Sequence, residues 1–87
     1  MSIALDQLPL GRPAVITSID WNGSDETIVR RLYEMGLDEG VDVELLHRGP
    51  LGGDPIAVRV GNMVLAMRRA QAGLVHAVLA EDYHGLP

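Results

Sequence analysis

The chain has 87 residues and a mass of 9.4 kDa, which is enough for one small domain with a compact core. Apolar residues make up 47% of the sequence and charged residues 22%, values that exclude a disordered or collagen-like chain. Twelve acidic residues oppose seven arginines and no lysine, and only three residues are aromatic; a net charge of −5 with so few stacking side chains argues against binding to nucleic acid or to an anionic membrane.

The sequence contains no cysteine, which excludes disulfides, thiolate metal sites and a cysteine nucleophile. Its longest uninterrupted apolar run, residues 63–67, falls far short of the ~20 residues needed to span a bilayer. The first residues lack a basic start followed by an apolar stretch, so no signal peptide is predicted. We therefore expect a cytoplasmic protein with no direct membrane insertion.

A helix is predicted to follow a first strand at residues 14–19, where β-branched side chains are frequent. Ser24 can cap the start of this helix. Its apolar residues Ile28, Leu32 and Met35 recur at i, i+4 and i+7, which predicts that these three side chains form the buried face.

The helix is expected to end at Gly36, because glycine adopts the left-handed conformation at the C′ position without a Cβ penalty. Leu37 would then fold back toward Leu32. A turn at Asp38-Glu39-Gly40 follows, and residues 41–46 alternate apolar and acidic side chains, as a half-buried antiparallel strand does.

Residues 48–55 are rich in glycine and proline and predict a long flexible turn; no lysine follows, so this is not a phosphate-binding loop. Two apolar runs, 56–60 and 63–68, then flank Gly61-Asn62 and predict a tight hairpin. The expected register brings apolar residues together on one face: Val60 with Met63, Val58 with Leu65, and Ile56 with Met67. The opposite face is only half polar, so we expect something to cover part of it.

A turn at residues 69–73 leads to a last predicted strand at 74–78. Five short strands with one helix after the first predict a mostly β protein and a small, partly open barrel, because so short a sheet can bury both faces only by curling. We expect residues 1–79 to form the domain and residues 80–87 to form a flexible C-terminal tail.

The run 31–40, followed by Val41 and Val43, resembles the helix-to-strand signature of the ferrous iron transport protein A (FeoA) family. The resemblance spans about residues 5–78. Its further matches follow in the family's order: the entry at Leu5 to Gly11, the hairpin opening at Gly53-Asp54-Pro55-Ile56, the hairpin glycine at Gly61, Arg68, Ala72, and the final strand at Leu74 to Val78.

This resemblance implies a five-stranded SH3-like barrel with a helix inserted after the first strand. It also implies a cytosolic accessory of ferrous iron uptake that contacts the permease FeoB, whose cytosolic part is a GTPase. The same barrel is appended to metal-dependent transcriptional repressors, so a regulatory module of that type is an alternative function. A homo-oligomeric structural module is another. Against the repressor type, the chain begins at a methionine and contains no helix-turn-helix pattern.

The sequence predicts neither a dedicated metal site nor an enzyme. His47, His76 and His84 are far apart and form no metal-binding pair, and Asp42 and Glu44 share a strand face without a third ligand nearby. No cofactor is required by any pattern, and only weak transition-metal association through His47 or His84 is expected. No nucleophile–base arrangement or pocket carboxylate pair is evident.

The arginines are the candidate partner-binding residues, because a guanidinium suits bidentate contacts with carboxylates at an interface. The four that we select are Arg30, Arg31, Arg59 and Arg68. The alternative is pairing within the chain, for example of Arg30 with Glu34. The glycines expected to have structural roles are Gly36, Gly40 and Gly61.

Overall fold

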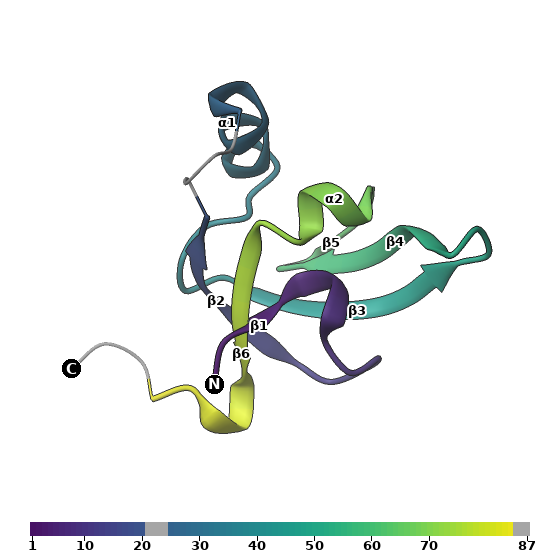
Figure 1. The fold of residues 1–87 in the computed structure, drawn as a ribbon. Helices are drawn as coiled ribbons and strands as arrows, with labels where there is room; N and C mark the ends of the chain where they lie inside the picture. Colours follow the sequence, from purple (N-terminus) through teal and green to yellow (C-terminus); the bar gives the residue numbers. More distant parts are fainter. Residues whose placement is uncertain (21–24, 85–87) are drawn as a thin grey trace.

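The computed structural model describes residues 1–20 and 25–84 of the chain. Within them, six antiparallel strands form one curved sheet with the order β1-β6-β2-β3-β4-β5 (Figure 1). The strands are β1 (Ile3–Ala4), β2 (Ala14–Ile19), β3 (Asp42–Gly49), β4 (Gly53–Val60), β5 (Met63–Met67) and β6 (Val75–Leu79). The mostly β architecture with an inserted helix is confirmed, and the sheet does not close, because β1 and β5 lie at opposite ends of the strand order.

The sheet has six strands where the sequence predicts five. The additional strand is β1, which pairs Ile3 with Ala77 and Ala4 with His76. Two residues are too few to show the alternation by which strands are predicted. The inserted helix consequently follows the second strand rather than the first.

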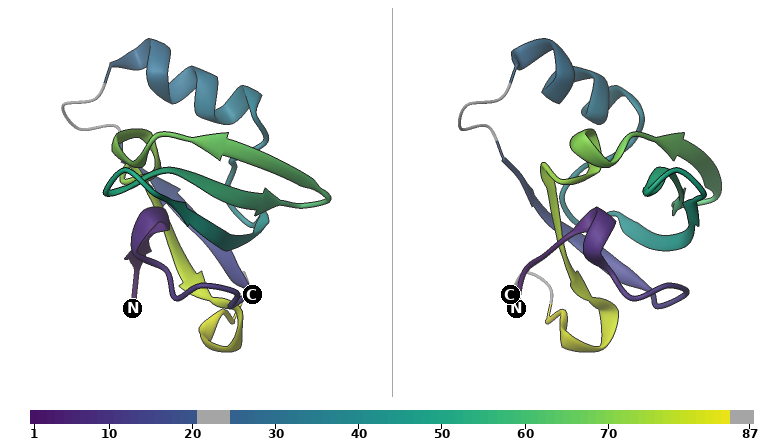
Figure 2. Two further views of the ribbon diagram at one scale, coloured as in Figure 1. Left: turned by 90° about the vertical axis from the view of Figure 1, so that its right-hand side faces the viewer. Right: turned by 45° about the vertical axis from the view of Figure 1, so that its right-hand side comes forward.

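The helical segments are η1 (Leu5–Gln7), α1 (Glu26–Glu34), α2 (Arg69–Ala72) and η2 (Ala80–Asp82). Helix α2 lies where the sequence predicts a turn. Its four residues are too few to show a helical period, so the pattern does not predict a helix there. In both views of Figure 2, α1 lies above the β4–β5 hairpin, at the opposite end of the molecule from the N-terminus. None of the described helices is long and apolar enough to cross a membrane.

The β4–β5 hairpin has the predicted register, which pairs Val60 with Met63, Val58 with Leu65 and Ile56 with Met67. Gly61 has a φ of +57°, whereas no described residue other than glycine, Asn62 included, has a positive φ. This combination is typical of a two-residue turn with glycine in the first central position. The six apolar residues are not equally buried, since Met63 is 53% exposed beside the turn.

Strands β3 and β4 extend into the predicted long turn at residues 48–55. Arg48 pairs with Ile56 and Gly49 with Gly53, so only residues 50–52 connect the two strands. Register shifts between Leu45 and His47 and between Arg48 and Gly49 accommodate this longer ladder. The segment between the strands is therefore a short turn rather than a flexible loop.

Helix α1 begins one residue later than predicted and turns a different residue inward. Ser24, the predicted N-cap, lies outside the described residues; Asp25 is the N-cap, and its carboxylate accepts the backbone N–H of Thr27 at 2.8 Å. The buried residues are Val29 and Leu32, whereas Ile28 is only half-buried. Positions 28 and 29 both lie within one helical turn of residue 32, so spacing alone does not choose between them.

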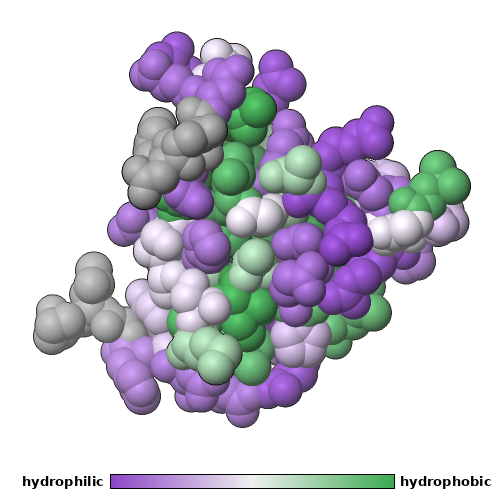
Figure 3. All heavy atoms as spheres, in the orientation of Figure 1, coloured by the Kyte–Doolittle hydropathy of each residue, from purple (hydrophilic) through white to green (hydrophobic). Residues whose placement is uncertain are grey.

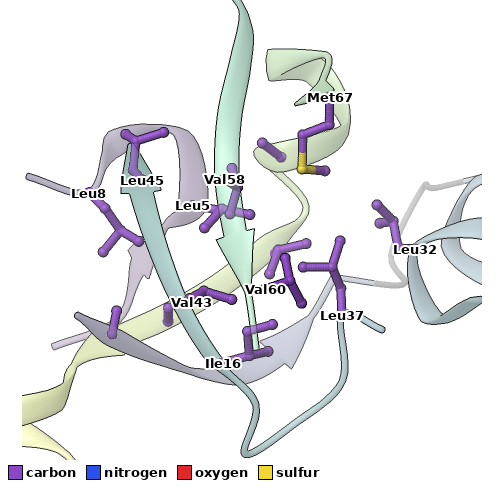
Figure 4. Packing of buried hydrophobic residues seen from close by; sticks show 14 of the residues in the cluster. Leu5, Leu8, Ile16, Leu32, Leu37, Val43, Leu45, Val58, Val60 and Met67 are labelled. Atoms are coloured by element: carbon purple, nitrogen blue, oxygen red, sulfur yellow. The ribbon is translucent and has the colours of Figure 1, made fainter. Parts of the chain in front are cut away.

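The end of α1 forms a Schellman motif. Gly36 has a φ of +91°, its N–H donates to Tyr33 O at 3.0 Å, and Leu37 N–H donates to Leu32 O at 3.1 Å. Leu32 and Leu37 are both fully buried and lie on the same side of the core (Figure 4). The chain therefore leaves the helix directly into the core. Gly40, in the next turn, also has a positive φ, +84°.

The core lies between the curved sheet, η1 and α1. Residues from almost every element are fully buried in one cluster, and Figure 4 labels Leu5 and Leu8 from the η1 segment, Ile16 from β2, Val43 and Leu45 from β3, and Val58 from β4 among them. The N-terminal segment thus contributes Leu5 and Leu8 to the core.

The beginning of the predicted tail is ordered as η2. Ala80 N–H donates to Pro13 O at 2.9 Å, and this bond joins the end of β6 to the segment that precedes β2. The division into a domain of residues 1–79 and a flexible tail of residues 80–87 stays a prediction.

The left-handed conformation of Gly36 predicts the effect of replacing it. Gly36→Val should lower the free energy of unfolding by about 1–2 kcal/mol, because a Cβ in this conformation collides with the backbone. The space around Gly36 is otherwise open, since a Cβ added there would meet only Val60 Cγ1, at 3.9 Å. Gly36→Asn is the matched control and should lose less stability, because asparagine tolerates this conformation. Urea unfolding measures both; an unchanged midpoint and slope for Gly36→Val would contradict the prediction.

Candidate functional site

Arg69 connects three separate segments of the fold. Its Nε and Nη2 donate to the carboxylate of Asp6 at 3.4 Å, and its Nη1 donates to Gly52 O at 2.8 Å. Its backbone N–H donates to the carboxylate of Asp54 at 3.1 Å. Asp6 is only 8% exposed. Arg69 thus holds η1 and the β3–β4 turn against α2.

Three other arginines also have partners within the chain. Arg48 Nη2 donates to Leu8 O at 2.9 Å, which fastens the η1 segment to β3. Arg12 forms an ion pair with Glu81, and Arg59 forms one with Glu44 across β3 and β4. For Arg59, a proposed partner-binding residue, contact with another protein would compete with the Glu44 carboxylate.

The remaining three arginines differ from these four. Arg30 and Arg31 are exposed on α1, and Arg68 is exposed at the junction of β5 and α2. Within the described ranges 1–20 and 25–84, no hydrogen bond or ion pair involves the guanidinium of any of the three, and the pair of Arg30 with Glu34, given above as the alternative, does not form. These three cations are therefore available to another molecule on a chain whose net charge is −5.

A shallow groove of about 560 Å³ lies beside Arg68, where the β3–β4 turn faces the end of β5 and the start of α2. It is lined by Leu51, Asp54, Pro55, Ala66, Met67, Arg68 and Gln71. Leu51, at the centre of the turn, is 82% exposed, and Val64 on β5 is 63% exposed. Apolar side chains protrude over the β3–β4 turn at the right of Figure 3. We name this feature, defined by the seven lining residues, the Leu51 groove.

Metal-binding chemistry has little support in the geometry. Across the part of the chain that the structure describes, no three His, Asp or Glu side chains are grouped so that they could hold a metal ion. His47 and His84 are exposed, and His76 lies half-buried on β6. A second cavity of about 210 Å³ offers one carboxylate, Glu39, beside Tyr83, and no histidine.

The Leu51 groove and the Asp6–Arg69 pair were not predicted from the sequence. The groove had one visible signal, because Leu51 is a large apolar residue in a turn of proline and glycine. The ion pair had none, since its partners are 63 positions apart and become neighbours only through the sheet topology.

The curved antiparallel sheet with its inserted helix defines a small SH3-like domain. A family model described as the FeoA domain matches residues 3–78. The chain belongs to the FeoA family. No match was found among curated proteins.

Solved structures agree with this assignment. The chain is similar to FeoA of Stenotrophomonas maltophilia, a prokaryotic SH3 domain protein determined in complex with zinc, with 36% identity over 88% of each chain and a TM-score of 0.74. It is also similar to FeoA of Chlorobium tepidum, with 35% identity over 98% of this chain and 81% of that one and a TM-score of 0.77. A manganese-dependent transcriptional repressor shares the fold, with 17% identity over 90% of this chain and 41% of its own and a TM-score of 0.77.

The burial of Asp6 predicts that its ion pair with Arg69 contributes more to the free energy of unfolding than the exposed pair of Arg12 with Glu81. Asp6→Ala should lower the free energy of unfolding by about 1–3 kcal/mol, because the donors on Arg69 lose their acceptor. Glu81→Ala removes the exposed pair with Arg12 and should change it by less than about 1 kcal/mol. Urea unfolding of the two variants side by side measures the difference, and equal losses would refute the assigned role of Asp6.

The arrangement of the histidines predicts only weak surface association of ferrous ion. Anaerobic calorimetry should detect no stoichiometric submicromolar binding to the chain, because a tight iron site requires several converging ligands. Stoichiometric submicromolar binding that His47→Ala abolishes would show that a site exists. His84→Ala serves as the matched control for loss of an exposed imidazole.

Proposed function

We propose that the chain is a non-enzymatic accessory protein of ferrous iron uptake, and that it acts in the cytoplasm by protein–protein contact with the cytosolic part of the permease FeoB. The observation that carries this proposal is membership of the FeoA family, which is associated with ferrous iron transport. The S. maltophilia relative is itself described as a candidate activating factor of ferrous iron transport. A binding role agrees with a surface whose described residues present cations and a groove but no evident catalytic arrangement.

The exposed face of α1 is the first part of the proposed contact. Val29 and Leu32 occupy the buried face of the helix, while Arg30 and Arg31 are adjacent and exposed. None of the described contacts gives these two unpaired positive charges a role in folding. Complementary charge on a partner would raise the rate of association and fix the orientation of docking.

Two other functions of this fold have less support. The likeness to the manganese-dependent repressor is a likeness of fold alone, because only 17% of the residues are identical. A homo-oligomeric module would need a self-complementary surface, and the described residues give no observation that identifies one. The zinc in the S. maltophilia structure supports weak transition-metal association here and does not require a resident metal.

Replacing both arginines of α1 tests the proposed contact. Arg30→Glu with Arg31→Glu should leave the fold intact, since each exposed substitution changes stability by under about 0.5 kcal/mol. Binding to the recombinant cytosolic part of FeoB should weaken, with the largest effect at low salt, where charges are least screened. Titration at two salt concentrations measures the affinity, and circular dichroism checks the fold.

Arg31→Glu alone and Arg12→Glu form a matched pair, because both reverse one exposed arginine. Arg12 is already paired with Glu81 of η2 and lies outside α1. Only Arg31→Glu should weaken binding. Wild-type affinity in the folded double variant would exclude the α1 face, and failure of the unaltered chain to bind would contradict the proposed function itself.

A further inference from the structure

The β3–β4 turn exposes Leu51 to solvent, and hydrogen bonds hold this turn in place. Asp54 N–H donates to Leu51 O at 3.3 Å within the turn, and Arg69 Nη1 donates to the neighbouring Gly52 O at 2.8 Å. Asp54 is held in turn by the backbone N–H of Arg69. Leu51 is 82% exposed, so its side chain contributes little to the stability of the fold. The three hydrogen bonds hold the turn that carries it. Such pre-organisation favours binding, because little conformational freedom is lost on contact.

The apolar surface continues from the turn along β5. Pro55, Ala66 and Met67 line the Leu51 groove, and Val64 is exposed two residues further back along the strand from Ala66. Val64 and Ala66 belong to the half-polar hairpin face, which the sequence predicts to be partly covered, whereas Met67 reaches the groove from the core side of the sheet. An apolar side chain placed in the groove would therefore contact several apolar groups at once.

The charges at the Leu51 groove select the chemistry of its occupant. Its one lining carboxylate, that of Asp54, accepts the backbone N–H of Arg69. Its one lining cation, that of Arg68, makes no hydrogen bond or ion pair in the described chain. The groove thus combines a mostly apolar lining with a guanidinium that has no partner among the described residues, and the complementary ligand has an apolar side chain close to a carboxylate.

We propose that the Leu51 groove docks a segment of the permease's cytosolic part in which an apolar residue lies next to an aspartate or glutamate. The apolar residue packs against Leu51 and Pro55, and the carboxylate pairs with Arg68. This inference rests on the proposed function and adds a second point of contact to the α1 face. Two contacts on one partner strengthen binding beyond either alone.

A second copy of this chain is a poorer occupant. Among the lining residues, a two-fold contact would offer each Arg68 only the Asp54 carboxylate of the other copy, one oxygen of which already accepts the Arg69 N–H. A permease segment with its own carboxylate carries no such restriction.

Titration of the full chain with the recombinant cytosolic part of FeoB tests the proposal. Leu51→Ser should weaken binding about tenfold, because a largely exposed leucine would no longer be buried on docking. Arg68→Gln should weaken it about threefold to tenfold, and more at low salt than at high salt. Leu10→Ser is the matched control, because Leu10 is also an exposed leucine in a connecting segment outside the groove, and it should bind within about twofold of the unaltered chain.

Amide chemical shifts of the isotope-labelled chain locate the contact. Docking at the groove should shift the signals of Leu51, Asp54 and residues 66–71. The groove would be excluded as a docking site if folded Leu51→Ser and Arg68→Gln bind normally while the α1 double variant binds weakly. The proposed function would then still stand. No binding by the unaltered chain would overturn both. A dimer seen in sedimentation that Leu51→Ser abolishes would assign the groove to a second copy and overturn the permease segment as its occupant.

Discussion

The contact between Asp6 and Arg69 holds the N-terminal η1 segment against α2. The carboxylate lies in η1 near the N-terminus and the guanidinium lies at the start of α2, 63 positions later. A buried carboxylate without this partner would be an uncompensated charge in the interior. Since Arg69 also holds Gly52 O and the Asp54 carboxylate, the same residue fixes the wall of the Leu51 groove. The packing of η1 and the shape of the candidate surface are thus linked through one residue, by its side chain and by its backbone N–H.

Local features of the fold were predictable because their causes are local. The Gly61-Asn62 turn sets the hairpin register, and Gly36 ends α1, since each depends on a few neighbouring residues whose conformations are restricted. The ordered set of matches along the chain also identified the family. Where a prediction relied on spacing alone, as for Ile28, the neighbouring residue Val29 proved to be the buried one.

Features that depend on contacts between distant segments could not be predicted. Arg59 appeared equivalent to Arg68 in the sequence, because both lie in the hairpin and outside its apolar face. In the folded chain, Glu44 is the cross-strand partner of Arg59 and pairs with it, whereas Arg68 lies beyond the end of the ladder and pairs with none of the described acids. The difference between a paired and an available cation arises from the register of β3 against β4. That register includes two shifts that no local pattern reveals.

The small contact of α1 with the core has an evolutionary consequence. Only Val29 and Leu32 of this helix are buried, and the Schellman motif at its end fixes its exit without help from the outer face. Mutations at the outer positions therefore leave the folded state almost as stable as before. Under selection for folding alone, these outer positions can accumulate substitutions, whereas Val29 and Leu32 cannot change without emptying or exposing part of the core.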